Sequence, residues 1–236
     1  MNVATLVLLH SPLTGAAVWG RLPERLADVG LRVVVPEIAA DEEPPFAARY
    51  VAEAARQVGA STADDPVVLV GHSGAGPLLP QVGFARRAVH RPAAGYLFCD
   101  AGLPRAGGTA SRLDLMSGED AAFAASLRTA LEQGERFPQW SADELADEVR
   151  DPADRALLAA SVRPRGLGFF SEPLPYPGDW PDARCGYLRT SQAYLVPARS
   201  AAARGWPVLE HESGHFAALD DPDGTATALL ELIRLM

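Results

Sequence analysis

One serine in this chain stands where a buried strand is expected to turn sharply into a helix. Val67–Val70 is an unbroken apolar run, which is typical of a strand buried on both faces. The run continues into Gly71-His72-Ser73-Gly74-Ala75, so small residues stand two positions before and two after the serine. This Gly-x-Ser-x-small pattern predicts a strained turn that holds the Ser73 hydroxyl in open space as a nucleophile. A serine that only caps the following helix is the alternative.

The elements that must hold this turn alternate along the chain between strand-like and helix-like segments. This alternation is typical of an α/β fold, in which helices cover both faces of a parallel sheet. We expect strands at Val3–Leu9, Arg32–Val35, Val67–Val70, Ala94–Cys99, Gly186–Leu188 and Val208–Glu210. We expect helices at Trp19–Val29 and Ala47–Val58, and a last helix from Asp221-Pro222 to Met236. Pro80 should kink or delay the helix that follows Ser73.

The long segment between the fourth and fifth strands has helix signals but no strand pattern. One such signal is the capping box Ser141-x-x-Glu144. We expect residues 104–182 to form a small helical cap inserted in a single domain, residues 1–236. A cap at this point would lie above the carboxyl ends of the strands, where open parallel sheets bind ligands. Four aromatic residues there either pack as core or roof a pocket: Phe137, Trp140, Tyr176 and Trp180.

The composition excludes some classes of partner. The net charge is −9, which disfavours nucleic acid and anionic membranes as partners, because both require a basic surface. The two cysteines, Cys99 and Cys185, have no set of zinc ligands around them and are expected to be buried free thiols. Met1 and Asn2 lead directly into the first strand without a targeting signal. We therefore expect a cytoplasmic protein, monomeric or homodimeric.

Several stretches resemble the α/β-hydrolase superfamily over essentially the whole chain. They are Leu8-Leu9-His10-Ser11-Pro12, Leu69-Val-Gly-His-Ser-Gly74, Ser213-Gly-His215-Phe and Leu157-Leu-Ala-Ala-Ser-Val-Arg163-Pro164. The likeness is greatest to a compact branch that includes plant methyl esterases and hydroxynitrile lyases. It implies an α/β-hydrolase fold, with a mostly parallel sheet of about six strands, helices on both faces and a small helical cap. It says less about the reaction, because one fold hosts many chemistries.

The resemblance implies a base and an acid for Ser73, whose hydroxyl is a weak nucleophile on its own. The family places its histidine in the loop after the last strand, where this chain has His215. The acid usually comes from the loop after the penultimate strand, but residues 189–194 contain no carboxylate. Asp100 is the candidate instead, because some members take their acid from the fourth strand. A dyad without an acid, or a carboxylate elsewhere in the chain, remains open.

The resemblance also implies an oxyanion hole made of two N–H groups. One donor would be Gly74. The second usually lies two residues after the strand-end histidine, and Pro12 stands there without an N–H. Either Leu13 supplies the donor through a shifted loop, or the hole lacks it. As substrate-binding residues we predict His10, His72, Trp140 and Trp180.

These residues together favour a serine hydrolase that uses neither a metal nor a cofactor. It would cleave a small ester, thioester or lactone with a hydrophobic acyl group through an acyl-enzyme on Ser73. One alternative is a lyase or cyclase of specialised metabolism, in which Ser73 and His215 act as acid–base groups. The other is a ligand-binding member of the fold that performs no reaction.

Overall fold

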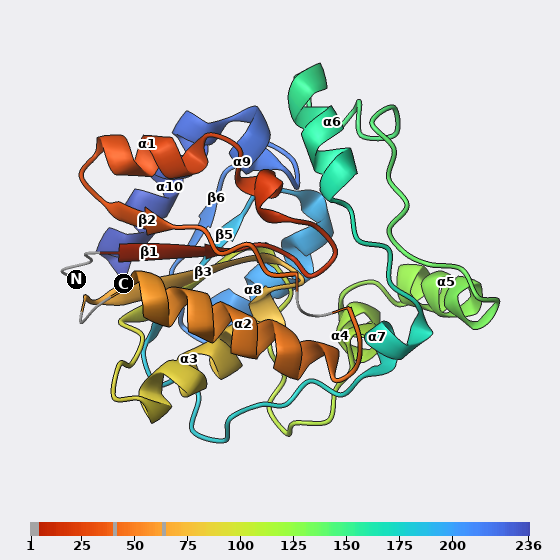
Figure 1. Ribbon diagram of the computed structural model, residues 1–236, viewed down its shortest axis with the longest axis horizontal. Helices are drawn as coiled ribbons and strands as arrows, with labels where there is room; N and C mark the ends of the chain where they lie inside the picture. Colours follow the sequence, from red (N-terminus) through yellow and green to blue (C-terminus); the bar gives the residue numbers. More distant parts are fainter. Residues whose placement is uncertain (1–4, 40–41, 63–64) are drawn as a thin grey trace.

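A parallel β-sheet runs through the middle of the protein (Figure 1). The computed structural model describes residues 5–39, 42–62 and 65–236. The strands among them are β1 (Thr5–Leu9), β2 (Arg32–Val34), β3 (Val67–Ser73), β4 (Gly95–Ala101), β5 (Arg184–Arg189) and β6 (Val208–Glu210). They form one six-stranded sheet in the order β2-β1-β3-β4-β5-β6, and every neighbouring pair is parallel. The predicted fold class is confirmed.

The strands agree with the predicted ones in position but differ at their ends. β3 continues beyond the apolar run to Ser73, and β4 continues beyond Cys99 to Ala101. Both extensions contain polar residues, so a search for apolar runs does not predict them as strand. Their backbones nevertheless continue the pairing between β3 and β4. Val3, the first residue of the predicted N-terminal strand, lies outside the described residues. Cys99 and Cys185 are buried free thiols.

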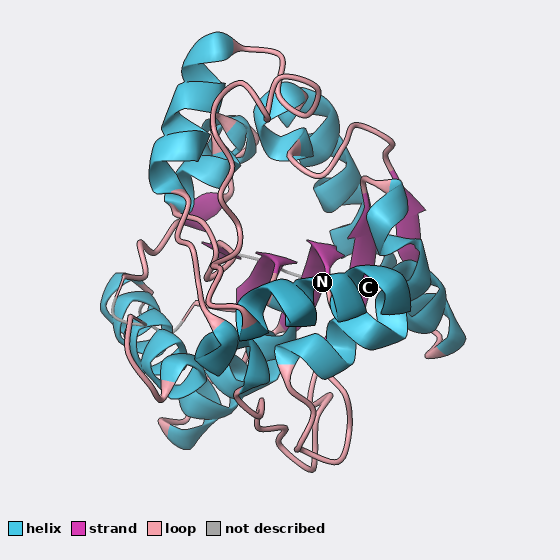
Figure 2. Cartoon of the chain, turned by 90° about the vertical axis from the view of Figure 1, so that its right-hand side faces the viewer, coloured by secondary structure: helices cyan, strands magenta, loops and turns pink. Residues whose placement is uncertain are grey.

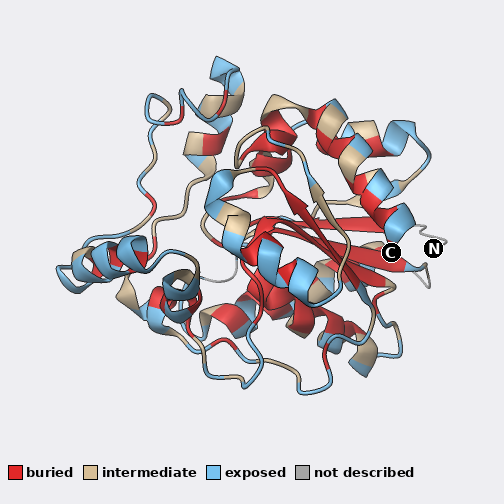
Figure 3. Ribbon diagram, turned by 180° about the vertical axis from the view of Figure 1, so that it is seen from behind, coloured by how far each residue is buried: buried red, intermediate tan, exposed pale blue. Residues whose placement is uncertain are grey.

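Two helical layers cover the sheet, one on each face. Alternate strand residues point to opposite faces, so Val7, Leu69 and Phe98 belong to one core and Leu8, Val70 and Leu97 to the other. The first core is covered by α2 (Phe46–Ser61), α3 (Leu79–Ala88) and α8 (Leu195–Ala203). The second is covered by α1 (Leu22–Asp28), α9 (Ala217–Asp220) and α10 (Pro222–Leu235). Figure 3 shows the buried strands between helices whose outer faces are exposed.

Two prolines and one glycine set where helices begin. The predicted helix at Trp19–Val29 is divided into the 3₁₀ turn η1 (Ala16–Trp19) and α1, because Gly20 between them has a φ of +44°. Pro23 lies in the first turn of α1, where its missing N–H costs no hydrogen bond. Pro80 likewise lies in the first turn of α3, after the 3₁₀ turn η2 (Gly76–Leu78). The helix after Ser73 is therefore delayed, not kinked.

The segment between β4 and β5 contributes four helices. They are α4 (Arg112–Glu119), α5 (Ala121–Glu132), α6 (Pro152–Ser161) and α7 (Leu167–Ser171). In Figure 1, α4, α5 and α7 lie to the right of the sheet, beyond the carboxyl end of β1, and Figure 2 shows that side facing the viewer. The capping box of Ser141 and Glu144 forms with reciprocal hydrogen bonds, but only turns follow it. Acidic residues at 147 and 148 would oppose the dipole at the end of a helix there.

None of the helices among the described residues is both long enough and apolar enough to cross a membrane.

The contact between α3 and β4 leaves no room for a side chain at Gly83. A Cβ atom at this position would lie 2.8 Å from Cε1 of Tyr96 and closer still to its hydroxyl oxygen. Tyr96 is fully buried and donates a hydrogen bond to Asp182 over 2.7 Å, so it cannot move aside freely. We expect Gly83→Ala to lower the free energy of unfolding by about 1–3 kcal/mol, measured by urea denaturation.

Gly59 in α2 is the matched control, because a Cβ atom there would meet nothing within 4 Å. We expect Gly59→Ala to raise the free energy of unfolding by about 0.5–1 kcal/mol, since alanine is the better helix former. Equal stabilities of the two variants would contradict the close packing of α3 on Tyr96.

Candidate active site

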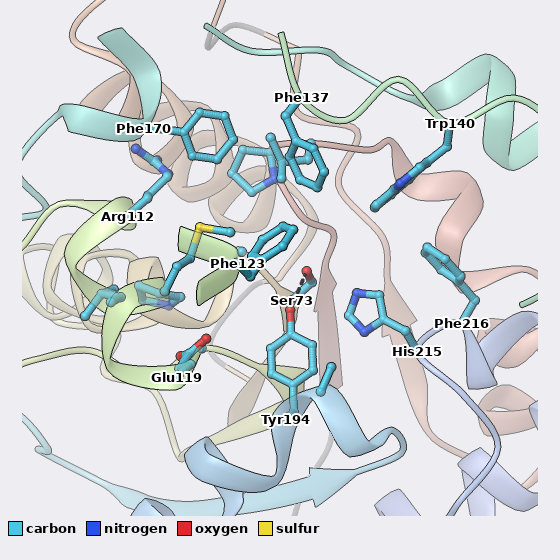
Figure 4. A pocket seen from close by; sticks show the side chains of 18 of the residues that line it. Ser73, Arg112, Glu119, Phe123, Phe137, Trp140, Phe170, Tyr194, His215 and Phe216 are labelled. Carbon is cyan, nitrogen blue, oxygen red and sulfur yellow. Dashed lines mark hydrogen bonds between the residues drawn. The ribbon is translucent and has the colours of Figure 1, made fainter. Parts of the chain in front are cut away.

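Ser73 lies on a strained turn at the end of β3 and lines a cavity (Figure 4). Its φ of +55° is in the left-handed region, which a residue other than glycine adopts only when its surroundings enforce it. The turn is closed by a hydrogen bond of 3.0 Å from the Ala75 N–H to the His72 carbonyl. A Cβ atom at Gly76 would lie 2.9 Å from Cβ of Ala101, so the closest approach to β4 is at Gly76.

A buried carboxylate and an imidazole meet beside this serine. His215, in the loop between β6 and α9, has its Nδ1 atom 2.8 Å from Oδ2 of Asp100 on β4. Asp100 is fully buried, with a φ of +44°. Its oxygens accept three more hydrogen bonds, from the N–H groups of Thr190 and Ser191 at 2.8 and 3.0 Å and from the Ser191 hydroxyl at 2.6 Å. The carboxylate is therefore fixed in orientation.

These contacts keep Asp100 ionised. Burial raises the pKa of its carboxyl, but the hydrogen bonds and charge of His215 and the hydrogen bonds of Ser191 and Thr190 outweigh burial and lower that pKa below its usual range. An ionised Asp100 holds the proton of His215 on Nδ1 and leaves Nε2 as the basic atom. The loop at residues 189–194, where the resemblance implies an acid, thus contributes hydrogen-bond donors to the carboxylate on β4.

Tyr194 contacts both Ser73 and His215. Its hydroxyl oxygen lies 3.1 Å from Oγ of Ser73, and its ring stacks on the His215 imidazole with centroids 5.0 Å apart and planes 8° apart. Among the described residues, the hydrogen-bond partner of the Ser73 hydroxyl is this phenol and not His215. Tyr194 is not among the predicted site residues, because the family pattern points to a carboxylate in that loop. An aromatic residue in the loop after the penultimate strand is the signal that could have found it.

The loop after β1 carries the candidate oxyanion donors. Leu13 and Gly74 both line the cavity. The Leu13 N–H donates to Oγ of Ser11 over 3.2 Å, and its carbonyl accepts from the Arg163 N–H at 2.9 Å. A guanidinium N–H of Arg165 donates to the carbonyl of Pro12 at 3.3 Å. The loop is thus anchored to the segment between α6 and α7, and the Leu13 N–H is engaged with a hydroxyl.

Of the four predicted substrate-binding residues, only Trp140 lines the cavity. His10 is fully buried, donates from Nδ1 to the Ser11 carbonyl at 2.8 Å and accepts at Nε2 from the Ile38 N–H at 3.0 Å. Trp180 packs in the sheet core against Tyr96, with ring centroids 5.6 Å apart.

His72, the fourth of these residues, is also outside the cavity lining. It donates from Nε2 to the carbonyl of His215 over 2.9 Å, and the two rings are 4.5 Å apart. Burial, together with the charge of His215, lowers the pKa of His72 to about 3, so the ring stays neutral. Through this hydrogen bond His72 holds the backbone of His215 in place.

The cavity above Ser73 has a volume of about 480 Å³ and is mostly apolar. The predicted aromatic residues divide between the two expected roles, because Phe137 and Trp140 line the cavity while Tyr176 and Trp180 pack in the core. Further rings come from residues that the sequence analysis did not single out: Phe123, Phe169, Phe170, Tyr194 and Phe216.

Glu119 adds a carboxyl group to this lining. Among the residues that the structure describes, no group of three or more His, Cys, Asp or Glu side chains is arranged to hold a metal ion.

Three solved structures match the fold of this chain over nearly its whole length. One is an extracellular alpha/beta-hydrolase from a Paenibacillus species, which is described as homologous in structure and function to tobacco Salicylic Acid Binding Protein 2. It is 17% identical to this chain with a TM-score of 0.75, and the match covers 97% of this chain and 98% of that one. Tomato methylketone synthase I, complexed with 2-tridecanone, is 19% identical with a TM-score of 0.71, covering 99% of each chain. Polyneuridine aldehyde esterase is 17% identical with a TM-score of 0.68, covering 98% of this chain and 100% of its own.

At these identities the likeness establishes the fold, and the predicted resemblance to the compact branch with plant esterases is confirmed at that level. A comparison with curated protein sequences finds no relative. The sequence model of the alpha/beta hydrolase family matches residues 6–228. Because that match spans most of the chain, the protein belongs to the alpha/beta hydrolase family.

Proposed function

We propose that this protein is a serine hydrolase that cleaves a small ester, thioester or lactone with a hydrophobic acyl group. The observation that supports it is the buried Asp100–His215 pair beside a serine that a strained turn presents to a cavity. This combination provides a nucleophile, a base and a group that orients the base, which are the parts that acyl transfer requires. The apolar lining of the cavity fits a hydrophobic acyl group.

In the proposed reaction, Nε2 of His215 takes the hydroxyl proton of Ser73 while Oγ attacks the carbonyl carbon of the substrate. The carbonyl π electrons move to oxygen and form a tetrahedral oxyanion. When this intermediate collapses, the bond to the leaving group breaks and His215 returns the proton to that group. Water then attacks the acyl-enzyme by the same route, and Asp100 stabilises the imidazolium in both halves.

The oxyanion would be held by the N–H groups of Gly74 and Leu13. The second of these must first leave Oγ of Ser11, because it donates to that hydroxyl at 3.2 Å in the present conformation. Tyr194 is the third polar group at the reaction centre. Burial raises the pKa of its phenol, so it stays protonated and can donate to Oγ of Ser73 while the serine proton turns to His215.

Two observations favour a lyase or cyclase as the second candidate. The Ser73 hydroxyl is bonded to Tyr194, and the Leu13 N–H is bonded to Ser11, so neither group is set for acyl transfer in this conformation. The solved structures with this fold include both an esterase and a methylketone synthase. In such a reaction Ser73, His215 and Tyr194 would move protons on a hydrophobic molecule without forming an acyl-enzyme.

Ser73→Ala removes the proposed nucleophile. We expect hydrolysis of p-nitrophenyl butyrate to fall by at least about 10³-fold, because only binding and oxyanion stabilisation remain. A fluorophosphonate probe should modify Ser73 of the wild-type protein, as read from the mass of the labelled peptide. Undiminished turnover in Ser73→Ala would exclude the acyl-enzyme, and an unlabelled wild-type protein would favour the lyase or cyclase.

Asp100→Asn replaces the carboxylate by an amide of the same shape, and asparagine tolerates the positive φ of this position. We expect kcat to fall by about 10³–10⁴-fold, because the amide no longer selects the Nδ1–H tautomer of His215. The measurement is steady-state hydrolysis of the same ester.

The pH dependence of stability provides a second readout for this variant. The folded-state pKa of Asp100 lies below its unfolded value of about 3.9, so its ionisation stabilises the fold above that pH and stops doing so as the pH falls through the folded-state value. We expect the wild type to exceed Asp100→Asn in free energy of unfolding at pH 7, and the difference to shrink below about pH 4. A difference that is constant from pH 7 to pH 3 would contradict an ionised Asp100.

Tyr194→Phe keeps the ring that stacks on His215 and removes only the hydroxyl. We expect kcat to fall by about tenfold with KM nearly unchanged, because one hydrogen bond at the reacting oxygen is lost. Tyr176→Phe is the control, since that hydroxyl bonds to the carbonyl of Trp180 in the core. Equal kcat values for wild type and Tyr194→Phe would show that the phenol takes no part in the reaction.

A further inference from the structure

Glu119 places a carboxyl group in the cavity that holds Ser73. It is the last residue of α4, and Figure 4 shows its side chain on the same side of the cavity as Tyr194. Its Oε1 atom lies 3.2 Å from the point that a Cβ on Gly102 would occupy, so the carboxyl is next to the backbone that follows β4. Among the residues that the structure describes, none makes a hydrogen bond or an ion pair with this carboxyl.

Glu119 is partly buried, and its carboxyl faces the cavity without a hydrogen-bond partner among the described residues. Buried polar groups are almost always hydrogen-bonded, and removal from water without a partner is unfavourable. Burial alone raises the pKa of Glu119 to about 7. At and above neutral pH, ionisation of this carboxyl therefore costs little, and a cation that enters the cavity finds the negative charge already formed.

The remaining charges of the cavity also favour a cation. Glu144 and Glu148 are exposed and line the same cavity. The positive side chain in the lining, Arg112 on α4, is engaged with Phe169 on α7. It donates to the Phe169 carbonyl at 3.0 Å, and its guanidinium lies 3.8 Å from the centre of the Phe169 ring. The charged side chains that face a ligand in this cavity are therefore mostly negative.

The walls provide the second component of a cation site. Faces of aromatic rings attract ammonium groups, and most strongly where water is excluded. Phe123, Phe137, Trp140 and Phe170 line the same cavity as Glu119 and Ser73. In Figure 4, Phe123 and Phe170 lie on the side of Ser73 that faces Glu119, and Trp140 lies on the side of His215. An alkylated ammonium group is apolar on its outside and charged at its centre, which suits a cavity lined by aromatic rings and carboxyl groups.

We propose that the substrate carries a cationic nitrogen, which the Glu119 carboxylate and the surrounding rings bind while the ester bond lies over Ser73. The substrate class is then an ester, thioester or lactone that contains an ammonium group. The part of this inference that concerns the ester bond rests on the proposed hydrolase function. The ammonium site does not depend on that function. In this proposal Glu119 is a specificity-determining residue.

The first test measures binding without turnover. Choline and 3,3-dimethylbutan-1-ol have the same shape and differ in charge, and isothermal titration at pH 8 and low salt gives the affinity of the wild-type protein for each. We expect choline to bind about tenfold more tightly, the range of a cation–π contact together with an ion pair. Glu119→Gln should lower the affinity for choline by about fivefold or more and leave that for the neutral alcohol within about twofold.

Glu132→Gln is the matched control, because it removes the same charge from an exposed position on α5 outside the cavity lining. It should change neither affinity. Equal affinities of the wild-type protein for the two probes, or an affinity for choline that Glu119→Gln leaves unchanged, would overturn the proposal. The unchanged binding of the neutral alcohol shows that a variant is folded.

A second test separates this inference from the proposed function. The p-nitrophenyl esters of 4-(trimethylammonio)butanoic acid and of 5,5-dimethylhexanoic acid are isosteric, and the charged ester should have the higher kcat/KM, mainly through KM, in wild type but not in Glu119→Gln. Choline binding that depends on Glu119 without hydrolysis of either ester would keep the site and remove the hydrolase. Equal hydrolysis of both esters without choline binding would keep the hydrolase and remove the site.

Discussion

The arrangement around Ser73 depends on one buried carboxylate. Asp100 accepts hydrogen bonds from His215, Thr190 and Ser191, which belong to the loops after β6 and β5. A charge with no access to water is tolerated only when its hydrogen bonds are complete, so these loops must close over it for the chain to fold. The requirement that stabilises the carboxylate thereby fixes the imidazole beside the serine.

The parallel sheet makes this convergence possible. All its strands end at the same edge, so the ends of β3, β4 and β5 and the loop after β6 bring together residues from distant parts of the sequence. The segment between β4 and β5 then encloses the space in front of that edge with aromatic rings and three carboxyl groups. The sheet thus positions Ser73 and Asp100, and the inserted segment contributes most of the rings that line the cavity.

The hydroxyl of Ser73 is hydrogen-bonded to Tyr194 and not to His215 in this structure. The strain at Ser73 is held by the close packing of the turn on β4, and the phenol occupies the serine hydroxyl while the imidazole is already oriented by Asp100. Catalysis of the proposed kind then needs rotation of the Ser73 side chain toward His215 and separation of the Leu13 N–H from Oγ of Ser11. Rotamer changes of this kind occur on fast timescales and leave the backbone in place.

The sequence by itself determined the fold and the serine turn. Both are indicated by local patterns of residues, namely runs of apolar residues and the spacing of small residues around Ser73. It also indicated His215 and offered Asp100 as one option among several. Only the tertiary structure decided that Asp100 contacts His215 and that Tyr194 contacts Ser73. It also decided that Trp140 lines the cavity whereas Trp180 packs in the core. Such contacts join residues about a hundred positions apart, and their formation depends on strand order, loop closure and packing, which no local pattern of residues encodes.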